Sequence, residues 1–391
     1  MLKETMHEIA GHAGITVNGR NPWDIEVRDD RLYKRIWRDQ SLGLGESYMD
    51  GWWECDRIDI MIHKILASGL ENKVKGNFIY LLRFLPAIFF NLQSARRSRI
   101  IADRHYDLGN DLFFSFLDPD YKQYSCGYFA HTDDMHQAQR DKLALICNKL
   151  NLTSSDHLLD IGCGWGGLAK YAAENYGCKV TGVNISREQL RYARETCAGL
   201  PIQFVDCDYR TIEGRFDKIV SVGMFEHVGM KNYRTFMKTA HRCLKDNGIF
   251  LLHSIGCNTS SLGRADPWIA RYIFPNGMLP SSAQLAKAAE KLFVMEDWHN
   301  IGPHYDKTLM AWNANFQRNW RHLKDKYDMA FKRMWEYYLT TCAGAFRARR
   351  LQVWQAVMTR QGSGTSQPQC RDFDVLRPRE GNKERIGQTL P

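Results

Sequence analysis

A glycine-rich run at residues 158–167 constrains the fold of this chain more than any other feature. Its sequence, LLDIGCGWGG, has the apolar pattern of a strand, then glycines, then the start of a helix pattern. Such a turn brings backbone amides and a helix N-terminus against a bound cofactor. Gly162, Gly164 and Gly167 have the spacing G-x-G-x-x-G, which by itself suits a nicotinamide dinucleotide equally well. The run predicts a cofactor-binding α/β domain and leaves the cofactor open.

Asp160 favours S-adenosylmethionine (AdoMet) over a dinucleotide at this turn. Its carboxylate ends the predicted strand, where it can face the cationic amino-acid part of AdoMet, whereas it would repel a pyrophosphate. Further along, where AdoMet and NAD folds both commonly place an acid on the ribose hydroxyls, the chain has Asn184. An amide can still bond a ribose hydroxyl, but the missing acid weakens the NAD interpretation more, because the dinucleotide fingerprint depends on it. AdoMet is therefore favoured and NAD remains the alternative.

Strand and helix patterns alternate after the glycine turn. An amphipathic helix at 133–150, capped by Asp133 or Asp134, is expected to precede it. The alternation predicts a doubly wound parallel α/β sheet. The expected strands are 157–161, 179–184, 202–205, 217–223 and 248–255, and the expected helices between them lie near 165–176, 187–198 and 232–244.

A chain of 391 residues exceeds the usual limit of a single core, which predicts a large domain and a smaller partner. Residues 1–94 have helix-like apolar spacing broken by glycines, and we expect a small helical domain there. Residues 95–360 are expected to form the catalytic domain. The composition of residues 361–391 is rich in Gly, Ser, Gln, Pro and charge, which predicts a disordered tail.

The second half of the catalytic domain departs from the alternating pattern. Residues 258–291 contain prolines and aromatic residues without a clear strand period, and we expect a helical insertion over the sheet edge. Insertions of this kind often form substrate lids. Two helices at about 305–322 and 327–346, followed by a strand at 351–359, complete the prediction.

Composition narrows the compartment and the partners. Eleven cysteines without a C-x-x-C pair, and no secretory signal, predict reduced thiols in the cytoplasm rather than a disulfide framework or a structural metal site. The net charge of +9 favours an anionic partner, either nucleic acid or an anionic membrane. After the predicted fourth strand, residues 224–229 have the sequence MFEHVG instead of the Asn/Asp-Pro-Pro-aromatic turn of a base methyltransferase, which argues against nucleic acid.

An apolar segment at residues 78–90 is a candidate membrane contact. It is interrupted by Arg83 and Pro86 and is shorter than the roughly 20 residues that span a bilayer, so no transmembrane helix is predicted. A basic run at residues 96–99 follows, and the combination suits a peripheral membrane contact. A core helix followed by a solvated basic face is the alternative.

Ligands of open α/β sheets bind beyond the carboxyl ends of the strands. After the second and third strands, the candidates are Asn184, Ser186, Gln189, Asp208 and Tyr209. Helix capping by Ser186, a solvated Gln189 and a plain surface loop at 206–210 are the alternatives.

Two ionisable residues follow the next strands. Glu226 comes after the fourth strand and His253 ends the apolar run of the fifth, so they can face each other across the site. A buried functional carboxyl with a perturbed pKa is expected at Glu226. A capping glutamate and a core histidine are the alternatives.

Further blocks match one known family. They are SLGLGESYMDGWWE (41–54), HYDLGND (105–111), QYSC (123–126), VSVGMFEHVG (220–229), YIFPNG (272–277), MEDWHN (295–300) and CAGAF (342–346). With the glycine-rich run, they resemble the cyclopropane fatty acid and mycolic acid cyclopropane synthases over about residues 15–360. The resemblance implies a Rossmann-like class I AdoMet-dependent methyltransferase with a small N-terminal helical domain.

The resemblance also implies a reaction. The AdoMet methyl group passes to the cis double bond of an unsaturated acyl chain in a membrane phospholipid, and bicarbonate-assisted proton loss closes a cyclopropane ring. Another AdoMet-dependent lipid or small-molecule methyltransferase, and a membrane-associated binding module without turnover, remain alternatives. The implied partners are a bilayer rich in anionic lipids, at the inner face of the cell membrane, and a second copy of the chain.

Motif matching gives roles to individual residues. Tyr124 and Ser125 are expected at the cofactor, and no metal is expected. A carbocation formed on the acyl chain calls for an apolar cavity lined with rings, and Phe225, Phe274, Trp298 and Tyr305 are the candidates. Glu226 beside an anion implies a shared proton. Cys342 is expected to shape the cavity rather than to react, because an alkene offers no electrophile to a thiolate. The residues implied to hold bicarbonate are Cys126, Glu226, His253, Ile255 through its backbone amide, and Tyr305.

Overall fold

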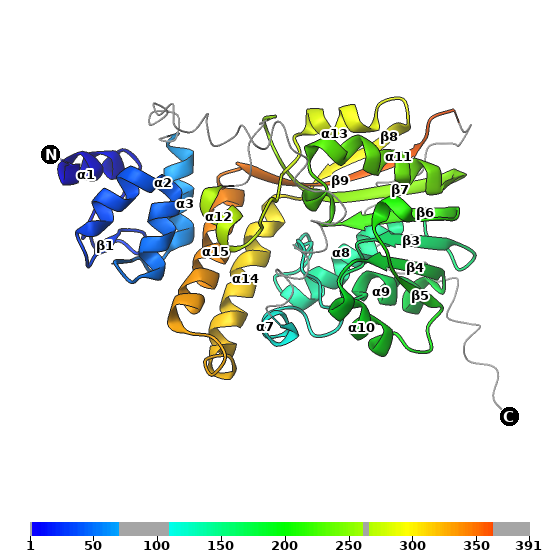
Figure 1. The fold of residues 1–391 in the computed structure, drawn as a ribbon, viewed down its shortest axis with the longest axis horizontal. Coiled ribbons are helices and arrows are strands. Elements are labelled where there is room, and N and C mark those ends of the chain that lie inside the picture. The colour runs from blue at the N-terminus through cyan, green and yellow to red at the C-terminus, as the bar shows by residue number, and fades with distance from the viewer. Residues whose placement is uncertain (1, 70–108, 261–265, 363–391) are drawn as a thin grey trace.

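A seven-stranded sheet organises the structure, a computed structural model that describes residues 2–69, 109–260 and 266–362 (Figure 1). The strand order is β5-β4-β3-β6-β7-β9-β8. Strands β3 to β7 are mutually parallel, as predicted. The strands are β3 (His157–Ile161), β4 (Lys179–Asn184), β5 (Ile202–Asp206), β6 (Phe216–Val222), β7 (Leu244–Cys257), β8 (Phe293–Asn300) and β9 (Leu351–Arg360).

The two strands beyond β7, β9 and β8, depart from the predicted parallel sheet. β9 was predicted as a strand, but it runs antiparallel to both of its neighbours, β7 and β8. β8 was not predicted at all. Its register shifts between Met295 and Asp297, and this irregularity breaks the two-residue period that identifies a strand in a sequence.

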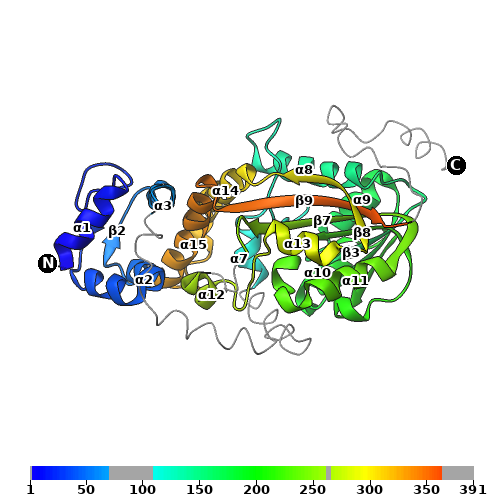
Figure 2. The same cartoon turned by 90° about the horizontal axis from the view of Figure 1, so that it is seen from above.

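Helices cover both faces of the sheet because successive strand residues point to opposite sides. α8 (Met135–Lys149) and α9 (Gly167–Tyr176) share a core with Leu158 on one face. α11 (Tyr233–Cys243) and α13 (Ser282–Ala289) share a core with Leu159 on the other, and Figure 2 shows the two layers from above. α10 (Arg187–Thr196) lies beside β4 and β5. Asp134, not Asp133, caps α8 by accepting from Gln137 N at 2.8 Å.

The predicted insertion at 258–291 divides into two parts in the described residues. α12 (Pro267–Tyr272) packs against α2, and the turn after it lies beside the glycine turn, because Phe274 and Asn276 line the same pocket as Gly162. α13 instead packs Leu285 against the sheet, so this half covers the sheet and does not form a lid.

The long helices α14 (Pro303–Asn319) and α15 (Met329–Arg347) lie between the sheet and the N-terminal elements (Figures 1 and 2). The N-terminal elements are α1 (Leu2–His12), β1 (Glu26–Val27), α2 (Arg31–Met49), β2 (Trp53–Glu54) and α3 (Ile58–Ala67). The β1–β2 pair was not predicted. One hydrophobic core joins Trp53, Trp335 and Trp165, so the N-terminal helices pack directly on the catalytic part. The predicted boundary at residue 94 lies outside the described residues.

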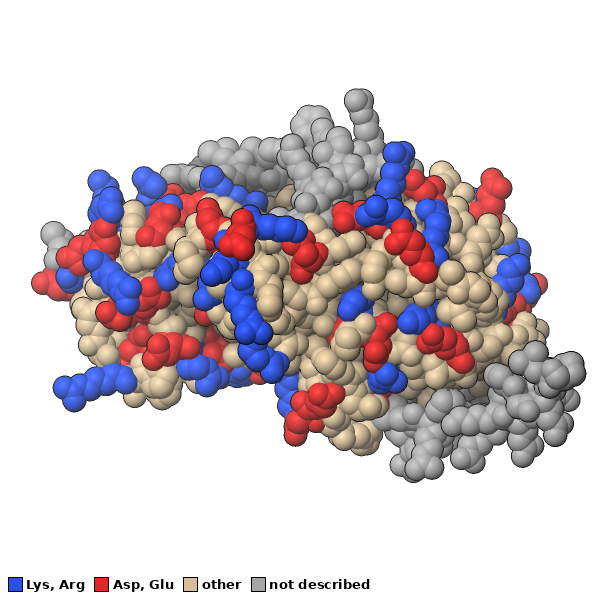
Figure 3. Space-filling model, turned by 90° about the horizontal axis from the view of Figure 1, so that it is seen from below, with Lys and Arg blue, Asp and Glu red and all other residues tan. Residues whose placement is uncertain are grey.

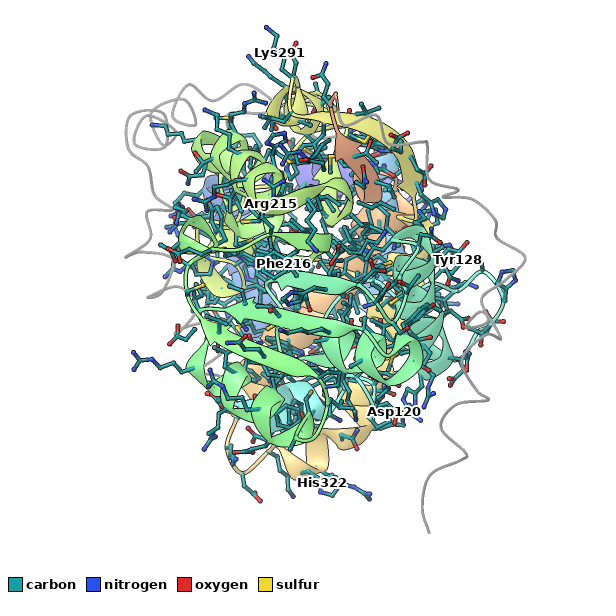
Figure 4. All side chains as sticks on the ribbon, turned by 90° about the vertical axis from the view of Figure 1, so that its right-hand side faces the viewer. Asp120, Tyr128, Arg215, Phe216, Lys291 and His322 are labelled. Atoms are coloured by element: carbon teal, nitrogen blue, oxygen red, sulfur yellow. The ribbon has the colours of Figure 1, made fainter. Side chains whose placement is uncertain are left out.

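Short elements complete the chain: α7 (Asn110–Phe114), η1 (Tyr209–Thr211), η2 (Phe225–His227), η3 (Met230–Asn232) and η4 (Trp320–His322). Trp165, just after β3, and Val353, near the start of β9, belong to the same core as α14 and α15. The carboxyl ends of the parallel strands therefore face these helices. Figure 4 turns the right-hand side of Figure 1 towards the viewer and shows Phe216, at the start of β6.

Among residues 2–69, 109–260 and 266–362, no helix combines the length and the apolar character needed to cross a membrane. The candidate membrane contact at 78–99 lies outside these ranges, as does the predicted tail from residue 363. The ten cysteines within these ranges are all free thiols.

Candidate active site

A pocket of about 1450 Å³, its open mouth included, lies at the carboxyl ends of the parallel strands. Most of the predicted cofactor residues line it. They are Tyr124, Ser125, Asp160, Gly162, Gly164, Asn184, Gln189, Asp208 and Tyr209. Gly167 and Ser186 are not among the lining residues.

The glycine turn forms the floor of the pocket. Gly162 has a φ of 88°, which a side chain would strain, and its amide donates to Val183 O at 2.8 Å. Gly167 has a different role from the one predicted. A Cβ atom there would lie 1.7 Å from Tyr121 O, so this glycine lets α9 pack against the chain at Tyr121.

Asp160 supplies a buried acceptor to the pocket. Its side chain is 2% exposed, and among the described residues Oδ2 has no hydrogen-bond partner. Burial raises the pKa of the carboxyl to about 7, against the opposing charge of Lys142. An unsatisfied buried carboxyl oxygen calls for a donor from a ligand. The ammonium group of AdoMet fits this position.

The residues after β4 hold one another in place. Asn184 Nδ2 donates to Gln189 Oε1 at 2.8 Å and to Gly164 O at 3.3 Å, which ties β4 to the glycine turn. Ser186 caps α10 by accepting from Gln189 N. The capping alternative is therefore correct for Ser186, whereas Gln189 is buried and not solvated.

The loop after β5 closes another side of the pocket. Asp208 caps η1 and forms an ion pair with Arg210 at 2.8 Å. Tyr209 is buried with its ring against Phe236, and its hydroxyl has no partner among the described residues. The plain surface loop considered for this segment is excluded by that burial.

Sequence reasoning missed the residues that support the segment 123–126. Lys142, in α8, is fully buried and donates to Ser125 Oγ at 3.0 Å and to Gln123 Oε1. The Tyr124 hydroxyl bonds that of Tyr338, in α15, at 3.0 Å. The sequence did contain a sign of the role of Lys142. It lies beside Leu143 on the apolar side of a predicted helix, where an apolar residue is normally found.

Glu226 is a second buried carboxyl, in η2 after β6. Oε1 accepts from the Ile255 amide at 2.6 Å, so that amide holds the carboxyl. Oε2 has no partner among the described residues. Burial raises the pKa of Glu226 to about 7, against the hydrogen bond from Ile255. The raised pKa expected at Glu226 is thus present.

Four of the predicted catalytic residues influence one another electrostatically. Burial holds the pKa of Tyr305 well above its ordinary value, and the groups of Cys126, Glu226 and Cys342 raise it further. Burial also raises the pKa values of the thiols of Cys126 and Cys342, to about 12 for Cys342. Both sulfur atoms are therefore protonated and unreactive at neutral pH.

His253 is buried and neutral. Burial lowers its pKa well below the ordinary value, and the charges of Lys142 and Lys149 lower it further. Gln355, opposite it on β9, lies with Nε2 at 3.4 Å from His253 Nδ1.

Of the four candidate rings, Phe274 lines the pocket and Phe225, Trp298 and Tyr305 do not. Phe225 stacks on Tyr233 with ring centroids 4.4 Å apart, and Trp298 packs on Trp354, both in the core under α11 and α13. This packing favours a core role for both rings. Phe274 lines the pocket, and Tyr305 packs against Phe346 at 4.7 Å.

Similarity to known proteins decides the family. The family model of mycolic acid cyclopropane synthetase matches residues 93–356. Cyclopropane-fatty-acyl-phospholipid synthase from Escherichia coli strain K12 is 53% identical over 354 residues, which cover 90% of this chain and 92% of the relative. The chain belongs to the mycolic acid cyclopropane synthetase family. Tuberculostearic acid methyltransferase of Mycobacterium tuberculosis is 31% identical, covering 86% of this chain and 82% of the relative.

Solved structures of the same family share the fold. A mycolic acid cyclopropane synthase complexed with SAH and CTAB has a TM-score of 0.62 and 33% identity, covering 66% of this chain and 97% of that chain. The cyclopropane synthase MmaA2 from Mycobacterium tuberculosis has a TM-score of 0.61 and 29% identity, with 66% and 96% covered. The family and the fold together show that this chain is a class I AdoMet-dependent methyltransferase. AdoMet, not NAD, is thus the cofactor of the glycine turn.

Proposed function

We propose that this enzyme methylates the cis double bond of unsaturated acyl chains in membrane phospholipids and closes a cyclopropane ring with the assistance of bicarbonate. The observation that carries the proposal is the buried Glu226, which has one oxygen held by Ile255 N and one oxygen without a partner among the described residues. The 53% identity to an enzyme named for this reaction supports it.

The cofactor half of the proposed site has the groups that AdoMet needs. Asp160 is the candidate for the ammonium group, and the amide of Asn184 with the ring of Tyr209 suits the nucleoside part. AdoMet supplies an electrophilic methyl group when bound. An alkene is a weak nucleophile, so the contribution of the protein is mainly to orient the two reactants.

The other half of the site must exclude water. Methyl transfer leaves a carbocation on the acyl chain, and water would convert it to an alcohol. Phe274, which lines the pocket, and Tyr305 are the rings proposed to stabilise this cation. Cys342, partly buried in the same core, shapes the cavity in this proposal.

Bicarbonate supplies a proton acceptor when bound, and five residues would hold it. They are Cys126, Glu226, His253, Ile255 and Tyr305. The Ile255 amide already donates to Glu226 Oε1, so Glu226 would share this donor with the anion. Glu226 must then carry a proton on Oε2 to avoid repulsion, and its pKa of about 7 supports this.

We further infer that the enzyme acts as a homodimer at the inner face of the membrane and favours anionic lipids. The net charge of +9 and the sequence of residues 78–99 support the anionic membrane partner, and the homodimer rests on the family resemblance alone. The face in Figure 3 carries acidic and basic side chains intermixed, so it adds no support from a basic patch.

The test uses the full chain with AdoMet and vesicles of unsaturated phospholipid, with and without bicarbonate, followed by mass spectrometry of the acyl chains. We expect chains heavier by one CH2 that have lost their double bond, and more of them with bicarbonate. Chains that gain a methyl group and keep an alkene, or saturated methyl-branched chains, would support the alternative lipid methyltransferase. The relative named tuberculostearic acid methyltransferase favours that alternative. AdoMet binding without any product would indicate a binding module.

A further inference from the structure

Lys142 is a buried cation beside the pocket. Its side chain is 0% exposed, and Nζ donates to Ser125 Oγ at 3.0 Å and to Gln123 Oε1. Both acceptors are neutral and both residues line the pocket. Because an ammonium group loses its hydration on burial, a fully buried lysine normally has a carboxylate partner. Within the described residues, no carboxylate forms an ion pair with Lys142.

The nearby carboxyls have other tasks. Asp118 acts on the charge of Lys142 from a distance, while its oxygens accept from the amides of Tyr121, Lys122 and Gln123. Asp160 faces the pocket with Oδ2 unsatisfied among the described residues. Neither neutralises Lys142 through a direct contact in the described residues.

A second buried lysine of α8, Lys149, has a carboxylate partner and serves as a comparison for Lys142. Lys149 lies two turns further along the helix and is 1% exposed. Its Nζ lies 3.2 Å from Asp297 Oδ2, an ion pair whose two side chains are both buried. The two lysines share a helix and a depth of burial, and the absence of a direct carboxylate partner distinguishes Lys142.

The charge of Lys142 acts on both halves of the site. It opposes the raised pKa values of Asp160 and Cys126, and it helps to keep His253 neutral. Burial lowers the pKa of Lys142 itself to about 8, so the side chain is cationic at neutral pH but close to losing its proton. A bound anion would stabilise that proton.

We propose that Lys142 is a positioning residue whose buried charge is completed by a carboxylate-type anion bound beside residues 123–126. Two ligands of this enzyme carry such a group, bicarbonate and the amino-acid carboxylate of AdoMet. The bicarbonate source rests on the proposed function, whereas the AdoMet source rests only on the cofactor. Through Gln123 and Ser125, Lys142 would also set the position of the segment that contains Tyr124 and Cys126.

The test compares Lys142→Met with the wild type in two measurements. The first is the dissociation constant of S-adenosylhomocysteine, which carries the same carboxylate as AdoMet, by titration calorimetry. The second is the bicarbonate concentration for half-maximal activity with phospholipid vesicles. We expect Lys142→Met to weaken one of the two by about tenfold or more, since a hydrogen-bonded charge is lost. The affected measurement identifies the source of the anion.

Lys218→Met is the matched control. Lys218 is another buried lysine, in β6, and it does not line the pocket. Its removal changes the net charge equally, and we expect both measurements to stay within about twofold of the wild type, as for substitutions far from a site. Equal results for Lys142→Met and Lys218→Met would overturn the proposal.

A pH series on the unmodified protein keeps the proposal testable if Lys142→Met does not fold. The groups that act on Lys142 are Asp118, Cys126, Asp160 and Cys147, and Lys142 in turn acts on His253. Between pH 8 and 9.5 the pKa of Asp160 lies below the range, those of the two thiols lie above it, and His253 stays neutral. Lys142 loses its proton in this range, so affinity for the anion should fall by up to about tenfold per pH unit. For S-adenosylhomocysteine this fall must exceed the one caused by deprotonation of its own α-amino group, which titrates in the same range. A flat profile for both ligands would contradict the proposal.

If the wild type binds S-adenosylhomocysteine but makes no cyclopropane, the proposed function is wrong. The effect of Lys142→Met on the dissociation constant of S-adenosylhomocysteine can still be measured. The two failures are therefore distinguishable.

Discussion

Asp160 and Glu226 are buried carboxyls with pKa values of about 7, and each has one oxygen without a partner among the described residues. Their surroundings differ in one respect. Asp160 is near the charge of Lys142, whereas Glu226 receives hydrogen bonds from backbone amides. The charge of Lys142 favours the ionised form of Asp160, and that form suits a cationic ligand. Glu226 instead suits a ligand that shares a proton with it.

Asp160→Asn should weaken AdoMet binding by about tenfold to a hundredfold, because a hydrogen bond to a charged group contributes roughly 1.5–3 kcal/mol. Titration calorimetry measures the change. Asp156→Asn is the control, because Asp156 precedes β3, bonds Thr153 and does not line the pocket. Equal affinities for the two variants would remove Asp160 from the cofactor site.

The raised pKa of Glu226 predicts a pH-dependent cost to the free enzyme. The pKa rises from 4.5 to about 7 on folding, so the folded state keeps its proton where the unfolded state loses it. This contribution favours folding below pH 4.5 and disappears as pH rises through 7, a loss of about 3 kcal/mol. Relative to the wild type, Glu226→Gln should become more stable by an amount of this order between pH 5 and 8, measured by urea unfolding. A difference that does not vary with pH would show that the carboxyl is ionised when buried.

At the scale of elements, the parallel strands and their helices could be predicted because each has an uninterrupted apolar period. β3 and β4 have the predicted bounds, and β8 was missed because its register shift places Glu296 and Asp297 within the strand. The same limit applies to the site. Asp160 lies at the end of β3 and Glu226 follows β6, so both could be identified. Lys142 stood out only as a lysine on an apolar helix face, and its contact with the segment 123–126 is tertiary.

Two glycines of the turn are needed for different reasons, Gly164 for its backbone conformation and Gly167 for close packing. Gly164 has a φ of 54° with open space around its missing Cβ, so Gly164→Ala should cost about 1–2 kcal/mol of backbone strain. Gly167→Ala would place Cβ 1.7 Å from Tyr121 O, and the start of α9 would have to move, at a cost of about 3 kcal/mol or more. Thermal unfolding with and without AdoMet measures both. If Gly164→Ala were the more damaging for stability, the packing role of Gly167 would be wrong.

At the scale of the molecule, an ionic network joins the N-terminal elements to the catalytic part. Arg347, in α15, binds Asp59 of α3 at 2.7 Å and binds both oxygens of Asp306 in α14. Asp59 is 1% exposed and also bonds Arg57. Asp306 directly follows Tyr305, so the network connects the N-terminal helices to the proposed catalytic residues.

This network, with the core that joins Trp53 and Trp335, predicts that the N-terminal and catalytic parts unfold in one transition. Calorimetry of the wild type should show a single peak. Arg347→Met should lower its midpoint, because loss of Arg347 leaves Asp59 with half of its partners and breaks the pair with Asp306, a change that costs about 3 kcal/mol or more when the pair is buried. Asp59→Asn should be less damaging when Arg347 is already methionine, with a coupling of about 1–3 kcal/mol in the double-mutant cycle. Two separate peaks in the wild type, or additive effects in the cycle, would mean that the N-terminal helices fold independently of the site.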